Sequence, residues 1–351
     1  GKMTTIIAFA LIISAIVWDL LVAKTSQNTP NSSEIPAPWY KQKMQVGNKA
    51  FMVYLLILTG FWTVYLQIFI TLPVFIRDFV DTSDLVRLLH SISPWLHDTL
   101  TAINIETLAS EITRLSKEFA NVDLHASKES IKDISTTLAS LDIRVPNGEL
   151  INAFTSLAQS GENLPQSSTD FANRWAEHYR QMNTATILSL DFLMIILFQV
   201  LISRFIDRFK ALPTLITGTA ILSVAMLIGG FAHGFILGGL MVAVSVIIFA
   251  VGEMTASPKS QEYVASFAPK EKAAMFMGYY FVSMALGNLF GGLLSGWLYQ
   301  SLAVDLANPM LMWTVISLLG LVTCIALYIF NRTLVSDIEQ QQQFQLAQAS
   351  E

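Results

Sequence analysis

Two acidic residues lie in apolar stretches of this sequence, where a carboxylate is a candidate for proton or cation chemistry. Glu253 follows the uncharged run LGGLMVAVSVIIFAVG, and Asp191 lies within TILSLDFLMIILF. A carboxylate in a low-dielectric site is destabilised unless it takes up a proton or meets a cation. The alternatives are an acid at a helix end on the cytoplasmic boundary for Glu253, and a water-accessible acid at the outer boundary for Asp191. The sequence leaves both pairs of interpretations open.

The composition indicates that the surrounding solvent is a membrane. The 351 residues are 53% hydrophobic and 13% charged, with a mean hydropathy of +0.52, which is more apolar surface than one soluble core would hide. None of the long apolar runs alternates with period two, so we expect an all-α membrane protein rather than a barrel. Seven runs approach the roughly 20 residues needed to cross a bilayer: 3–23, 50–76, 184–204, 212–232, 236–255, 273–298 and 309–331.

The distribution of basic residues predicts the orientation. Lys and Arg are frequent in 24–49, 204–211 and 256–272 and are absent from the turns 231–236 and 299–308. Positive charge favours the cytoplasmic side, and we therefore expect a multi-pass protein of the inner membrane. An alternative is that the first run is a signal peptide cleaved near Ala23, but this would place the lysines of 24–49 outside.

A long polar connection separates the second and third runs. Residues 78–182 hold 15 acidic and 8 basic side chains, and their apolar residues recur at helical spacing, which predicts amphipathic helices packed on one another. The breaks ISPW, VPNGE and GENLPQSS divide the connection into four or five helices. The predicted orientation places it on the extracytoplasmic side. His90 and His97 lie two turns apart, but two imidazoles without a third ligand favour surface histidines over a metal site.

Several classes of chemistry leave no signal. The sequence has no phosphate-binding glycine loop after a strand, no HExxH and no CxxC, and its single cysteine is Cys324. The net charge of −5 is spread over loops, which disfavours a nucleic-acid surface. We therefore expect neither an enzyme nor a bound cofactor or metal.

The helix count favours one half of a major facilitator fold. Six predicted helices follow the first one, in two sets of three, which is how each half of such a transporter is built. The turn within LISRFIDRFKALPTLITG carries Arg204, Asp207 and Arg208. Such charges can pair across a turn and close the cytoplasmic side in one state of a rocking cycle. The alternative is a set of solvated cytoplasmic charges.

Four glycines on the predicted helix 273–298 form two small-xxx-small pairs, which let helices approach closely. We expect them to pack against neighbours within the same half. They are Gly287, Gly291, Gly292 and Gly296.

A more specific resemblance begins at Glu253. The stretch GEMTASPKSQEYVASFAPKEKAAMFMGYYFVSMALGNLFGGLLSG resembles the tenth and eleventh helices of the proton-dependent oligopeptide transporter family, with its Gly-Glu, Ser-Pro and Ala-Pro in order. GFWTVYLQIF resembles that family's seventh helix, and SLDFLMII stands where its eighth helix has Ser-Leu-Asn-Pro. The resemblance covers 50–76 and 184–331 and leaves out 78–182.

The resemblance implies roles for individual residues. Glu253 would receive the positively charged amino terminus of a substrate and take part in proton coupling. Asp191 stands at the family's Asn and adds a second titratable group. Tyr280 replaces a Trp as an aromatic wall, and Gln67 and the nearby Tyr65 would line the pocket. Leu66 replaces an acidic residue usual in the seventh helix, and Phe192 replaces the Pro of the eighth.

The resemblance also implies an organisation of the chain in which 1–23 is the family's sixth helix and helices one to five are missing, together with their acidic-aromatic coupling motif. The expected boundaries are 1–23 (sixth helix), 24–49 (cytoplasmic loop), 50–77 (seventh helix), 78–182 (helical insert), 183–332 (eighth to twelfth helices) and 333–351 (cytoplasmic tail).

The function expected from these observations is alternating-access, proton-coupled uptake of peptides or related amino-bearing solutes. Its partners would be the substrate, protons, the bilayer and the missing amino-terminal half. Two alternatives remain: a facilitator of another substrate such as a drug or sugar, because fold does not fix function, and a non-transporting receptor or scaffold that acts through the insert.

Overall fold

The computed structural model describes residues 49–268 and 273–335, and its regular structure there is helical, apart from one isolated bridge between Ile143 and Arg180. The predicted helix 1–23, the loop 24–48 and the tail beyond 335 lie outside the described residues. Within the described part, six helices are long and apolar enough to cross a membrane. The predicted fold class, an all-α membrane protein with a helical insert, is confirmed.

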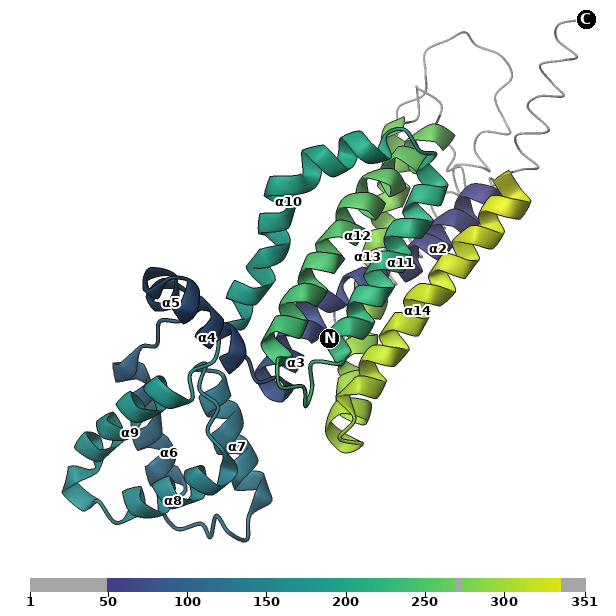
Figure 1. The fold of residues 1–351 in the computed structure, drawn as a ribbon. Coiled ribbons are helices and arrows are strands. Elements are labelled where there is room, and N and C mark those ends of the chain that lie inside the picture. Colours follow the sequence, from purple (N-terminus) through teal and green to yellow (C-terminus); the bar gives the residue numbers. More distant parts are fainter. Residues whose placement is uncertain (1–48, 269–272, 336–351) are drawn as a thin grey trace, which may run out of the picture.

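The six spans lie side by side in one bundle, with α10 inclined against the others and beside α12 (Figure 1). The first span consists of two helices separated by Leu66, and the fifth extends through a π-helical segment, Tyr299–Asp305. The bundle helices are α2 (Lys49–Tyr65), α3 (Gln67–Phe79), α10 (Thr184–Ile206), α11 (Ala211–Gly230), α12 (Gly238–Phe267), α13 (Ala273–Leu298) and α14 (Pro309–Phe330); a second π segment, Asn331–Val335, follows α14.

Helix α12 is longer than the sequence predicted. The predicted span was 236–255, yet the helix continues through Pro258 to Phe267. Proline removes one backbone donor from a helix, and the lost hydrogen bond does not end α12 because further contacts hold this turn. The Ser260 hydroxyl donates to the Ser257 carbonyl at 2.7 Å, and the Tyr54 hydroxyl of α2 donates to the Ser260 carbonyl at 3.1 Å.

Against the described residues, one pair of the α13 glycines serves close packing and the other does not. A Cβ added at Gly287 would lie 2.3 Å from Trp62 Cβ of α2, and one added at Gly291 would lie 3.2 Å from the Thr63 carbonyl oxygen. A Cβ at Gly292 or Gly296 would meet nothing within 4 Å. Gly287 and Gly291 therefore let α13 approach α2 closely, whereas the other pair faces open space.

The connection between α3 and α10 forms a second helical unit, whose own apolar core is made by residues 108–176, whereas Leu85 and Val86 pack into the core of the bundle. It has six α-helices rather than four or five, because Asn104 and Ser127 cap α6 and α7 through their side chains at boundaries that carry no Pro or Gly. The helices are α4 (Ser83–Ile92), α5 (Pro94–Leu100), α6 (Ile105–Glu118), α7 (Lys128–Ala139), α8 (Asn147–Ala158) and α9 (Leu164–His178), with a 3₁₀ turn, Gly161–Asn163, before α9.

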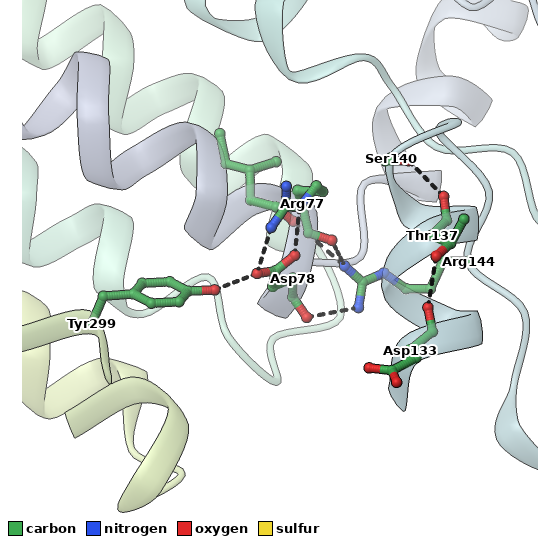
Figure 2. Close-up of polar contacts among 8 residues, drawn as sticks. Arg77, Asp78, Asp133, Thr137, Ser140, Arg144 and Tyr299 are labelled. Atoms are coloured by element: carbon green, nitrogen blue, oxygen red, sulfur yellow. Dashed lines mark hydrogen bonds and ion pairs between the residues drawn. The ribbon is translucent and has the colours of Figure 1, made fainter. Parts of the chain in front are cut away.

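Two charged side chains join this unit to the ends of the bundle helices. The Asp84 carboxylate accepts hydrogen bonds from the backbone amides of Gly239 and Leu240, at 3.1 and 2.8 Å, at the start of α12. Arg144 donates to the carbonyls of Ile76, Arg77 and Asp78 at the end of α3, as Figure 2 shows. An acid at a helix start and a cation at a helix end both complement the helix dipole.

Candidate functional site

Glu253 lies in the middle of α12, not at its end. It follows the first residue of the helix by 15 positions, or about 22 Å at the usual rise, and the helix continues for a further 14 residues. Its Oε1 accepts a hydrogen bond from the Tyr65 hydroxyl, at 2.7 Å, from the end of α2. The break at Leu66 follows Tyr65 directly, so the hydroxyl is presented from a helix end.

Asp191 reaches the same place from α10. Its side chain belongs to the small buried face of that helix, and the residue is only 1% exposed. The Asp191 and Glu253 carboxyl groups are close enough to influence each other electrostatically. Among the described residues, no hydroxyl, amide or cationic donor reaches either oxygen of Asp191 or Oε2 of Glu253. Three buried carboxyl oxygens, two from Asp191 and one from Glu253, thus have no hydrogen-bond donor among the described residues.

Aromatic rings gather around Tyr65, whose hydroxyl binds Glu253. The Tyr65 ring lies 5.6 Å from those of Phe69 and Phe249, measured between centroids. Phe249 precedes Glu253 by one helical turn, and Phe192 follows Asp191 directly and lies 6.4 Å from Phe69. These rings make the neighbourhood of Tyr65 apolar, and the faces of aromatic rings attract cations.

This arrangement can hold a proton or an organic cation. Two neighbouring carboxylates repel each other in an apolar setting, so the pair is stabilised when one takes a proton or when a positive charge lies between them. The aromatic rings favour an ammonium group over a fully hydrated metal ion. Within the described residues, no group of three or more His, Cys, Asp or Glu is arranged to hold a metal.

Comparison with known proteins identifies the family. Residues 168–346 match the Major Facilitator Superfamily, which is just over half of the chain. The chain belongs to the Major Facilitator Superfamily. It is also similar to the multidrug resistance protein MdtH of Salmonella newport and of Salmonella typhimurium strain LT2, with 29% identity over 121 residues in each case. That match covers 34% of this chain and 29% of each relative's length, so the chain spans less than a third of these proteins.

In this major facilitator chain, the structure brings three of the five predicted substrate residues together, namely Tyr65, Asp191 and Glu253. Tyr280 of α13 is fully buried elsewhere in the bundle, where its hydroxyl lies 3.1 Å from Ser260 Oγ. It can support the wall of the site but does not contact the acid pair.

Gln67 is placed between helices. Its amide nitrogen donates to the carbonyls of Thr63 and Gly291, at 2.8 and 3.1 Å, and its oxygen accepts from Thr71. Since the residue is fully buried, its side chain ties α3 to α13 in this state of the major facilitator bundle.

The charges expected to close the cytoplasmic side pair differently from the predicted set. Asp207 lies 3.7 Å from the ammonium group of Lys259 on α12, which also pairs with Glu262 at 2.6 Å. Lys259 is only 2% exposed, whereas Arg204 and Arg208 are exposed, and Arg208 stacks over the ring of Phe205. Among the described residues, Asp207 is therefore the one member of the predicted gate that joins two transmembrane helices.

Sequence reasoning missed Lys259, Glu262 and the aromatic rings. The i, i+3 spacing within PKSQE is a signal for the Lys259–Glu262 pair. The i, i+4 spacing of Phe249 and Glu253 places both on one helix face and is the corresponding signal for the aromatic surroundings.

Proposed function

We propose that this chain is part of a secondary active transporter that carries an amino-bearing solute by alternating access and couples its movement to protons. Tyr65, Asp191 and Glu253 form the binding site for the amino group. Peptides are the first solute class to test, because the resemblance of 252–296 to the oligopeptide transporters aligns Glu253 with the residue that receives a peptide amino terminus.

The observation that carries this proposal is the shared burial of two carboxyl groups from different helices without a cationic partner among the described residues. A purely structural pair of this kind would be costly, since unpaired buried charge is destabilising. A site whose ligand is a proton in one state and an ammonium group in another accounts for that cost. Competition between the two ligands is then the coupling step.

A second candidate substrate class is the lipophilic amine. The aromatic rings around Tyr65 provide both apolar surface and cation–π attraction, and the relatives named above are multidrug resistance proteins. A peptide differs from a lipophilic amine in carrying a carboxylate, which needs a cationic partner elsewhere in the transporter.

We further propose that the protein resides in the inner membrane, with α4–α9 on the extracytoplasmic side and the turn that carries Asp207 on the cytoplasmic side. The two features lie at opposite ends of the bundle, because α10 begins beside the insert and ends at Asp207 (Figure 1). The excess of basic residues on the Asp207 side supports this orientation. Residues 50–77 and 183–332 are then the transport segments, and 78–182 is the insert.

The experiment is uptake into proteoliposomes that contain the full-length protein, under an inward proton gradient. Labelled di- and tripeptides are compared with a fluorescent lipophilic amine such as ethidium. We expect one class to be transported and Glu253→Gln to reduce its transport at least tenfold. The matched control is Asp305→Asn, which neutralises an exposed acid outside the site and should leave uptake unchanged. Absence of transport for both classes, or equal uptake by Glu253→Gln and native protein, would refute the proposal.

A further inference from the structure

A cavity of about 630 Å³ lies where the insert meets the end of the first membrane span. Its walls come from the end of α3, from one face of α7 and from the π-helical segment that extends α13. These walls belong to the insert and to the bundle alike. Neither Asp191 nor Glu253 lines this cavity, and the cavity has no role in the proposed transport cycle.

The lining is strongly basic. Four basic side chains and one acidic side chain border the cavity: Arg77, Lys128, Lys132, Arg144 and Asp78. The single acid is already engaged, because Arg77 donates to both Asp78 oxygens, at 2.6 and 3.0 Å, and the Tyr299 hydroxyl donates to Oδ2, as Figure 2 shows. The positive charges of the two lysines are therefore not offset by a carboxylate that lines the cavity, whereas Arg144 interacts with Asp81 and Asp78.

Neither lysine pairs with an acid in the part of the chain that the structure describes. Within the described residues, no carboxylate lies within ion-pairing distance of Lys128 or Lys132. They are four positions apart on α7 and so share one helix face, which continues with Ser135 and Thr136 toward the bundle. Ammonium and hydroxyl donors in a row are the groups that bind phosphate oxygens.

Arg144 adds a further donor. Its two terminal nitrogens are used by the carbonyls at the end of α3, but its buried Nε–H has no partner among the described residues. Burial lowers the pKa of Arg144, so a further negative charge nearby would stabilise this guanidinium.

The position of the cavity suggests the origin of the anion. The membrane-spanning helix ends at Phe79, which lines the cavity together with Val304 and Ala307. The cavity thus combines basic groups with apolar residues at the height where a bilayer's polar and apolar regions meet. We propose that this cavity binds a phosphate-bearing anion, with the phosphodiester headgroup of an anionic phospholipid as its source, and that the bound phosphate links α7 of the insert to α3 and α13.

The test titrates the full-length protein in detergent with dihexanoyl phosphatidylglycerol and, separately, with inorganic phosphate, followed by calorimetry. Native protein is compared with Lys132→Gln and with Lys128→Gln/Lys132→Gln. The matched control is Lys117→Gln, which removes an exposed lysine of α6 outside the cavity. All three lysines are on the surface of the insert, and circular dichroism checks that each variant folds.

We expect phosphatidylglycerol affinity to fall about fivefold for one lysine and about thirtyfold for both, and to remain unchanged for Lys117→Gln. The same loss with inorganic phosphate alone would support the anion site and assign it to a free phosphate instead of a lipid. Equal affinities of the native protein and the double variant for both probes, or no binding of either probe to the native protein, would overturn the proposal.

Discussion

Replacing Gly287 by alanine tests whether the approach of α13 to α2 holds the site together. The added Cβ would lie 2.3 Å from Trp62 Cβ, 3.0 Å from the Thr59 carbonyl oxygen and 3.1 Å from the Thr63 amide nitrogen. Carbon atoms pack at about 3.5–4.0 Å, so the helices must separate by more than about 1 Å at this point. Two of the three contacts are backbone atoms, which cannot rotate away.

The expected cost follows from these contacts. Overpacking a tight interface destabilises by about 1–3 kcal/mol, and the rigid backbone contacts place Gly287→Ala near the upper end. Alanine is favoured over glycine in a helix by about 0.5–1 kcal/mol, which leaves a net loss of about 2 kcal/mol. Gly292→Ala has the same helix-propensity gain but meets nothing within 4 Å, so it should be neutral or slightly stabilising.

Thermal unfolding of the full-length protein in detergent measures the difference. A loss of about 2 kcal/mol corresponds to a midpoint lower by about 4–8 °C in a domain of this size. Uptake should also fall in Gly287→Ala, since Trp62 packs against Tyr65 at a centroid distance of 5.1 Å. If Gly287→Ala and Gly292→Ala had the same midpoint, the close approach of α2 and α13 would not exist as described.

Two further predictions concern other parts of the molecule. Asp142 has a backbone φ of 59°, and burial raises the pKa of its carboxyl group. The folded state therefore prefers the protonated acid, so the contribution of Asp142 to stability is present below pH ~4 and is lost as the pH rises through the folded-state pKa. Asp142→Asn should therefore stabilise the insert at pH 7 by less than about 1 kcal/mol and should give no gain in stability below pH ~4. Amide hydrogen exchange near 143–145 measures this gain at both pH values, and a gain that persisted in acid would contradict the prediction. At the end of the bundle that carries Asp207, Asp207→Asn alone should change the stability by less than about 1 kcal/mol, because Glu262 still pairs with Lys259. Asp207→Asn/Glu262→Gln leaves a buried ammonium unpaired and should cost about 3 kcal/mol or more. Additive effects in this double-mutant cycle would show that Lys259 does not couple the two acids.

The sequence predicted the described spans well because lipid imposes a simple rule. A helix must be apolar over about 20 residues and satisfy its own backbone, so hydropathy alone located all six described spans. The deviations occur where local chemistry overrides that signal. α12 passes Pro258 because contacts from Tyr54 and Ser260 hold the turn, and the first span breaks at Leu66 without any proline at that point.

The site was harder to predict because it depends on which helix faces meet. Glu253 and Asp191 stood out as charges in apolar runs, but their common position depends on α10 lying against α12. Gln67 was expected in the pocket, yet its amide lies between α3 and α13, where two carbonyls accept its hydrogen bonds. A polar residue in a membrane helix can serve either packing or substrate, and spacing along one helix does not distinguish the two.

The claim that Asp191 and Glu253 couple protons to solute movement is tested most directly by separating exchange from accumulation. Proteoliposomes with the full-length protein are loaded with the transported solute, and labelled solute is added either without a pH gradient or with an inward one. The account predicts that Asp191→Asn still exchanges solute without a gradient, because Glu253 remains to bind the amino group, but no longer accumulates it when a gradient is applied. Gradient-driven accumulation by Asp191→Asn at the level of the native protein would contradict it.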